Sequence, residues 1–325
     1  MPRKDVGVDK VLKKLQASVD EGKFYEASQM YHSLSQRYLK SGKEDIAKDL
    51  LYRGILSFLA AGHADSAFDL STKMMEVYLA SETNPEDDES ARSRLLEIFR
   101  AFPGTTDKAT WRLDYARSVR RWAAKALGNN CGHPGLNHDF GSAFYQEGEY
   151  YAAESFLLFG TLESARVLGR MASEWSIKES DAPDPGYFIA RETLGLLALK
   201  KLQHAKSCVE TYIKLASQAA EKDAQGKSTF TGMIVPYYDA ITNDSTQFQL
   251  YKSALLNFSV FLNMACERGV PAKESFSMLR NHYKNALITV DDYLPALVDS
   301  VGENFFGLHS NKPKNPLADL MKGMF

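Results

Sequence analysis

Three turns near the start of this chain repeat at a fixed interval and limit what it can fold into. The pattern Gly-x-x-x-x-Ala begins at Gly22, Gly42 and Gly62, twenty residues apart, and a fourth copy begins at Gly148. Each copy lies where one apolar-periodic stretch ends and the next begins. Glycine suits the left-handed residue that ends a helix, and the small alanine lets the next helix pack closely. This spacing predicts a stack of helices, an architecture that usually binds other proteins.

Apolar residues recur at steps of three and four through most of the chain, as on one face of an α-helix. The stretches with this period are 8–20, 24–39, 46–59, 67–78, 88–101, 107–127, 135–147, 149–160, 186–200, 203–221, 247–267, 272–288 and 291–307, with short, weaker helices over 162–178. We therefore predict an all-α fold, a right-handed α-solenoid of stacked antiparallel helix pairs. Two helices per forty residues exceed the roughly 34 residues of a tetratricopeptide repeat, so the likeness to that repeat is architectural.

Residues 222–246 break the helical rhythm. They combine β-forming residues with Gly226, Gly232 and Pro236, and a helix is disfavoured from Gly232 to Pro236. We expect a β-hairpin inserted between helices, with a flexible loop as the alternative. Two strands alone are marginally stable, so such a hairpin would need support from the helices or from a partner chain.

The composition excludes some classes of function. The formal net charge is −2, whereas a nucleic-acid-binding protein typically has a strong basic excess. Three cysteines are too few for a disulfide framework and fit a reducing compartment. The first ten residues lack the apolar core of a signal peptide, and no apolar run reaches the roughly eighteen residues of a transmembrane helix. We expect a cytosolic protein.

The sequence carries no recognisable catalytic or cofactor motif. Phosphate loops, dinucleotide-binding glycines, zinc-protease and serine-hydrolase motifs are all missing. Cys131, His133 and His138 are three possible metal ligands within eight residues, but zinc sites usually draw a fourth ligand from a second pair. Pro134 more simply begins a helix. We therefore expect no catalytic residues, no metal and no cofactor, and no nucleophile–base arrangement supports an enzyme.

Several segments, in order along the chain, resemble the Golgi to ER traffic protein 4 family, and the insert is similar to its fungal form. They are VLKKLQASV (11–19), FYEASQMY (24–31), Arg37-Tyr38, GILSFL (54–59), Asp69-Leu70-Ser71, Gly132-His133-Pro134, GEYYAAE (148–154) and NFFGL (304–308). No single segment is diagnostic, but the ordered set covers about residues 8–308.

The resemblance implies a non-enzymatic adaptor in the delivery of tail-anchored membrane proteins to the ER. Residues 1–160 would dock on the targeting ATPase. Residues 161–308, with the insert 222–246, would hold a ubiquitin-like co-adaptor that recruits a chaperone-bound co-chaperone. Residues 309–325 would be a flexible tail. Tethering two partners on one solenoid raises their effective concentration. The alternative is a helical-repeat subunit of an unrelated complex, which would usually add a winged-helix module.

The candidate ATPase contacts are polar residues of the first four expected helices. Arg37 and Lys40 lie near the end of the second, and Asp69 lies in the Asp-Leu-Ser step that the family shares. The first 48 residues carry ten basic and seven acidic side chains, and this basic excess suits an acidic face on the ATPase. Asp69 would face the nucleotide-coupled surface of the ATPase, or it would simply lie on a solvated helix face.

The candidate co-adaptor contacts are apolar residues. They are Phe230, Ile234, Val235, Tyr237 and Tyr238 in the insert, with Phe305 and Phe306 near the end of the last expected helix. A permanent interface would cover an apolar patch that is otherwise exposed. Phe305 and Phe306 could equally close the last helix pair as core residues.

Overall fold

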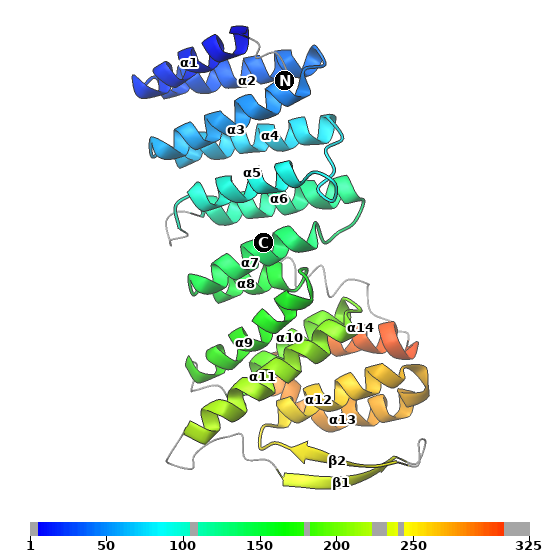
Figure 1. Cartoon of the computed structure of the whole chain (residues 1–325). Coiled ribbons are helices and arrows are strands. Elements are labelled where there is room, and N and C mark those ends of the chain that lie inside the picture. The colour runs from blue at the N-terminus through cyan, green and yellow to red at the C-terminus, as the bar shows by residue number, and fades with distance from the viewer. Residues whose placement is uncertain (1–5, 105–109, 179–182, 223–232, 240–243, 309–325) are drawn as a thin grey trace. The chain divides into compact units, whose positions relative to one another are not determined.

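The computed structural model describes residues 6–104, 110–178, 183–222, 233–239 and 244–308, which form two compact units, Met1–Phe140 and Gly141–Phe325. The elements labelled in Figure 1 are α1 (Val6–Asp20), α2 (Phe24–Lys40), α3 (Glu44–Ala60), α4 (Ala64–Ala80), α5 (Glu89–Ala101), α6 (Trp111–Leu127), α7 (Pro134–Gln146), α8 (Tyr150–Leu157), α9 (Leu162–Lys178), α10 (Tyr187–Ala198), α11 (Leu202–Lys222), β1 (Met233–Asp239), β2 (Asp244–Leu250), α12 (Ala254–Arg268), α13 (Lys273–Val290) and α14 (Leu294–Phe306). The predicted all-α class with a hairpin insert is confirmed.

The repeated glycines end helices, as the sequence predicts. Gly22, Gly42 and Gly62 have φ of +74°, +68° and +80°. After each glycine the next backbone N–H bonds the carbonyl five residues earlier, as in the bond from His63 to Phe58 at 2.9 Å. This is the Schellman arrangement, which satisfies carbonyls at the end of a helix. The paired alanines, such as Ala47, are completely buried, so the turn and the close helix packing belong to one repeated unit.

Two further turns of this type lack glycine. Glu82, twenty residues after Gly62, has φ of +51°, and Lys200 has φ of +60°. The Schellman bond is present in both, from Thr83 to Tyr78 at 2.9 Å and from Lys201 to Leu196 at 2.9 Å. A side chain in the left-handed region costs about 1–2 kcal/mol relative to glycine. These two positions therefore carry local backbone strain.

The helices of the first unit form two alternating rows. Each of α1, α2 and α3 packs on the helix that follows it, and α1 also contacts α3, α2 contacts α4, α3 contacts α5 and α4 contacts α6. Buried aromatic rings pack between and along the rows: Tyr31 of α2 meets Phe58 of α3 edge-on at 6.0 Å, and the Tyr78 ring of α4 lies 5.3 Å from Trp122 of α6. Contacts between neighbours and next-neighbours are what a helical-repeat stack requires.

In the second unit α10 is the central helix. It contacts α9, α11, α12 and α14, and nearly all of its residues are buried. Arg191 of α10 donates from Nε and Nη2 to the carboxylate of Glu154 on α8, at 2.6 and 2.9 Å. Glu154 is 1% exposed, so this two-point ion pair is desolvated and holds α8 against α10.

A turn at Asp184 joins α10 to the start of α12. The Asp184 carboxylate accepts hydrogen bonds from the Ser253 hydroxyl at 2.5 Å, from the Leu255 N–H at 3.0 Å and from the Gly186 N–H at 2.8 Å. An added Cβ on Gly186 would overlap with the Ser253 hydroxyl. Glycine at this position therefore allows the predicted turn to lie against the N-terminus of α12.

Two segments differ from the sequence-based expectation. Residues 162–178 form one helix of 17 residues, because packing of α9 on α11 outweighs the weak local propensity. The helix expected to resume near residue 247 begins instead at Ala254. Residues through Leu250 pair with β1, from Met233 opposite Leu250 to Asp239 opposite Asp244, and Ser253 caps α12 by accepting from the Leu256 N–H. No helix within the described ranges is long and apolar enough to cross a bilayer.

Candidate functional site

Two exposed cations lie in the last turn of α2. Arg37 and Lys40 are both exposed, and in the described part of the chain neither belongs to an ion pair. The Arg37 guanidinium lies 5.5 Å from the centroid of the Tyr38 ring. Cations in the last turn of a helix complement its dipole, but their charged ends remain available to an acidic partner.

Asp69 is joined to a histidine of the neighbouring helix. Asp69 lies on α4 with 62% of its side chain exposed, and its Oδ2 is 2.7 Å from His32 Nε2 on α2. This pair links the two helices that the candidate ATPase contacts occupy. It also orients the Asp69 carboxylate, because the second oxygen remains free for a partner while the first is held by the imidazole.

The exposed face of α4 is acidic. Asp65, Asp69, Thr72 and Glu76 follow one another at steps of four, three and four residues, and all four are exposed, which places them on one side of the helix. We define the α2–α4 face as Arg37 and Lys40 together with these four residues. It presents positive charge at the end of α2 and negative charge along α4. A complementary partner therefore has to carry both negative and positive side chains.

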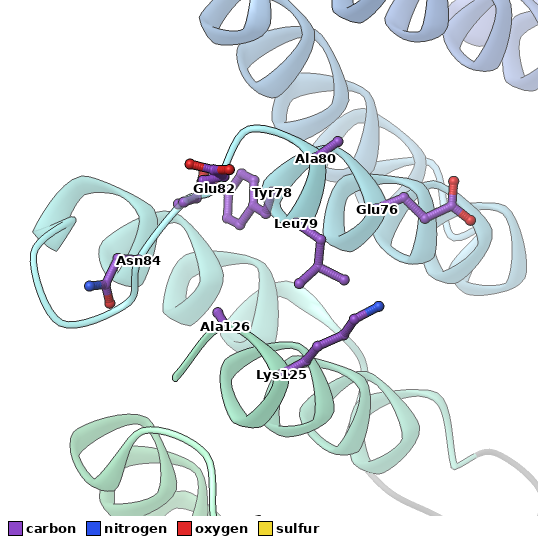
Figure 2. Close-up of a pocket in the computed structure, with 9 residues that line it drawn as sticks. Glu76, Tyr78, Leu79, Ala80, Glu82, Asn84, Lys125 and Ala126 are labelled. Carbon is purple, nitrogen blue, oxygen red and sulfur yellow. The ribbon is translucent and has the colours of Figure 1, made fainter. Parts of the chain in front are cut away.

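A cleft lies at the C-terminal end of α4, where the acidic row ends (Figure 2). Its volume is about 750 Å³, and its lining comes from α4, the following turn and the end of α6: Glu76, Tyr78, Leu79, Ala80, Glu82, Thr83, Asn84, Lys125 and Ala126. Figure 2 shows Glu82 and Lys125 on opposite sides, with the Leu79 and Ala126 side chains between them. The cleft therefore has charged walls and an apolar middle.

The apolar candidates lie in the second unit. Ile234, Val235, Tyr237 and Tyr238 are in β1, opposite Gln249, Phe248, Thr246 and Ser245 of β2. Phe230 lies outside the described residues. The main contact of each strand is with the other strand, which leaves the hairpin with little helical support. A two-stranded hairpin is marginally stable alone, so a bound partner would stabilise it.

The two phenylalanines of α14 have different surroundings. Phe306 is 1% exposed and stacks on Phe276 at 4.4 Å between ring centroids. Phe305 is only half-buried, and its ring centroid lies 6.5 Å from that of Phe306. The core alternative therefore applies to Phe306, while Phe305 remains a possible contact.

His133 and Cys131, on the N-terminal side of Pro134, stabilise the turn before α7. His133 Nδ1 accepts from the Leu136 N–H at 3.2 Å, and the Asn137 amide donates to the Cys131 carbonyl at 2.8 Å. Burial, together with the nearby Arg92, lowers the pKa of His133. Pro134 is the first residue of α7, as predicted, and across the described ranges no group of three His, Cys, Asp or Glu side chains could hold a metal ion.

A comparison with protein families identifies the family of this chain. The family model of Golgi to ER traffic protein 4 matches residues 24–325, which include every helix from α2 to α14. The chain belongs to the Golgi to ER traffic protein 4 family. The resemblance that the sequence segments indicate is therefore confirmed.

Curated relatives match along most of the chain. The Golgi to ER traffic protein 4 of Aspergillus fumigatus is 26% identical over 329 aligned residues, which cover 98% of this chain and 89% of the relative. The human homolog of Golgi to ER traffic protein 4 is 27% identical over 303 residues, covering 93% and 81% of the two chains. The crystal structure of C. therm. Get4 has a TM-score of 0.75 at 23% identity and covers 98% of this chain and 96% of its own, so the family fold is shared.

His32, which holds Asp69 of the α2–α4 face, is not among the residues that the sequence predicts for this site. The first residues of α2 and α4, Phe24 and Ala64, are forty positions apart. Position 69 of α4 therefore corresponds to position 29 of α2 in the repeat. His32 lies one helical turn after position 29. The repeat spacing therefore contains the signal that brings His32 to Asp69, although nothing in the sequence indicates that the pair forms a hydrogen bond.

Proposed function

We propose that this chain is a non-enzymatic adaptor that bridges a ubiquitin-like co-adaptor and the cytosolic ATPase that delivers tail-anchored proteins to the ER. The observation that carries the proposal is the family match over residues 24–325. Two features support it: the α2–α4 face presents mixed charge in the first unit, and a hairpin with little helical support lies in the second. One chain would then hold two partners at once, which raises their effective concentration.

The α2–α4 face would dock the ATPase. Its charges are exposed, which favours a reversible, salt-sensitive contact over a permanent one. Arg37 and Lys40 would meet acidic side chains of the ATPase. Asp69 would meet a basic one, with His32 holding its carboxylate in place at 2.7 Å.

The hairpin and α14 would dock the co-adaptor. Tyr237 and Tyr238 supply the aromatic residues that are enriched in interfaces, and Ile234 and Val235 add apolar surface of the kind found at an interface core. Phe305, half-buried at the end of α14, would extend this contact. Burial of the hairpin under a partner would replace the support that it lacks from the helices.

Charge reversal tests the ATPase surface. We expect the double variant Arg37→Glu, Lys40→Glu to weaken ATPase binding about thirtyfold at low ionic strength, because two attractive contacts of about 1 kcal/mol each become repulsive or are lost. The loss should shrink as salt screens the charges. Titration of the ATPase by isothermal calorimetry at two salt concentrations measures both effects.

A matched control carries the same change in charge elsewhere. Arg170 and Lys214 are exposed residues of α9 and α11 in the second unit, so Arg170→Glu, Lys214→Glu should leave ATPase affinity near that of the unmodified chain. If both double variants weaken ATPase binding equally, the change in net charge causes the effect, and the positions of Arg37 and Lys40 do not. An unchanged dissociation constant for the first variant at low salt would remove Arg37 and Lys40 from the site.

A further inference from the structure

The cleft at the end of α4 contains a residue in a strained conformation. Glu82 has φ of +51° at the turn position that glycine occupies in the three preceding repeats. Its side chain is exposed and reaches the cleft lining, as Figure 2 shows. Strained residues of this kind gather at binding and catalytic sites. The proposed adaptor function gives the cleft no role.

The two helices that line the cleft both end there. Leu79 and Ala80 belong to the last turn of α4, and Lys125 and Ala126 to the last turn of α6. The carbonyls of Tyr78 and Leu79 accept N–H groups of the turn after α4, and that of Lys125 accepts the Gly128 N–H, but the dipole of each helix still places partial negative charge at its C-terminus. The dipoles of two helices that end at one cleft favour a cation there.

The charged side chains around the cleft are not equivalent. Glu76 already has a partner, because its Oε2 is 2.6 Å from Lys73 Nζ. The Glu82 side chain has no ion pair or hydrogen-bond partner in the described part of the chain. Lys125, on the opposite side from Glu82 (Figure 2), lies in the last turn of α6, where it offsets that helix dipole. The unmatched negative charge is therefore at the Glu82 side.

We propose that this cleft binds a short extended segment of a partner protein by its arginine or lysine side chain. The cationic head would meet the Glu82 carboxylate at the negative end of the α4 dipole, and the aliphatic stem would lie over Leu79 and Ala126. Lys125 would donate to a carbonyl or carboxylate of the same segment and so set its direction. A volume of about 750 Å³ falls in the range of sites that hold small ligands, which is enough for a few residues.

The test uses the full chain, isotope-labelled for NMR, and a matched pair of peptides. The first is acetyl-Ala-Leu-Arg-Leu-Ala-amide, and the second replaces arginine by citrulline, which has nearly the same shape without the charge. We expect the arginine peptide to shift the amide signals of residues 79–84 and 125–126 and the citrulline peptide to bind about tenfold more weakly, as loss of one charge-assisted contact implies. Equal binding of the two peptides, or shifts confined to other residues, would overturn the proposal.

Glycine variants separate binding from stability. Glu82→Gly removes both the carboxylate and the strain, so it should raise the Tm by about 2 °C while weakening the arginine peptide about tenfold. Lys200→Gly relieves the other strained turn, which does not line the cleft; it should raise the Tm similarly and leave peptide binding unchanged. If the Glu82→Gly chain binds the arginine peptide as tightly as the unmodified chain, Glu82 is not a ligand and the proposal fails.

Discussion

Replacing Gly169 by alanine should destabilise the second unit by about 3 kcal/mol, near the top of the range for overpacked cores. Gly169 lies where α9 crosses α11, and an added Cβ would overlap with the carbonyl oxygen of Cys208 and lie 3.0 Å from Thr211 Cβ. The obstacle is backbone, so the two helices must separate. The gain in helix propensity from glycine to alanine, about 1 kcal/mol, is too small to offset this.

Buried thiols in the same unit report the effect. Cys208 and Cys266 are buried, so a thiol reagent labels them only after local or global opening. In Gly169→Ala, peptide mass spectrometry should find Cys208 labelled at a clearly lower urea concentration than in the unmodified chain. Gly195→Ala is the matched control, since its nearest neighbour is the flexible Leu158 side chain at 3.1 Å. Equal urea midpoints for the two variants would contradict the proposed role of Gly169.

The second large effect concerns a buried carboxyl and depends on pH. Glu192 of α10 is 1% exposed, and its Oε2 has no hydrogen-bond partner. Burial raises the pKa of the Glu192 carboxyl well above its ordinary value, the charge of Glu154 adds to this, and Arg191 opposes it. The neighbouring Glu154 accepts the hydrogen bonds from Nε and Nη2 of Arg191, so the folded protein favours the neutral form of Glu192.

The sign of the pH effect follows from proton uptake. In the unfolded chain the carboxyl ionises near pH 4.3, so above this pH folding requires a proton. Below the pKa of the unfolded chain, Glu192 does not reduce the free energy of unfolding. As the pH rises from there toward the raised pKa of the folded protein, the free energy of unfolding falls by up to about 1.4 kcal/mol per pH unit. Glu192→Gln removes this requirement and keeps the side-chain volume, so its advantage over the unmodified chain should grow with pH.

Urea unfolding followed by circular dichroism measures this difference. Between about pH 5 and pH 7 the free energy of unfolding of Glu192→Gln should rise relative to that of the unmodified chain, by at most about 1.4 kcal/mol per pH unit. Glu163→Gln, at an exposed ion pair of α9, should show no such trend. If the Glu192→Gln and unmodified curves stay parallel across this range, Glu192 is ionised in the folded protein.

Local chemistry explains what was predictable from the sequence. The glycine turns at Gly22, Gly42 and Gly62 depend on one residue type in one backbone conformation, so their spacing predicts the helix ends. Glu82 occupies the same kind of turn without that residue type. Its place, twenty residues after Gly62, was the available signal, but only the backbone conformation distinguishes it from an ordinary surface acid.

Tertiary contacts explain what was not predictable. The ion pair between Glu154 and Arg191 joins residues 37 positions apart on different helices, and no repeat spacing indicates it. Phe248 and Leu250 fit either a helix or a strand by local pattern, and pairing with β1 decides for the strand. In the candidate site, the sequence indicates Arg37, Lys40 and Asp69 singly, while the link between Asp69 and His32 required the packing of α2 on α4.

The central claim is that one chain carries two independent docking surfaces, and a crossed pull-down with both partners tests it most directly. A deletion of residues 225–249 removes β1 and all of β2 except Leu250. This variant should retain the ATPase and lose the co-adaptor. Arg37→Glu, Lys40→Glu should lose the ATPase at low salt and retain the co-adaptor. Loss of both partners from either folded variant, or retention of both by the hairpin deletion, would contradict the account.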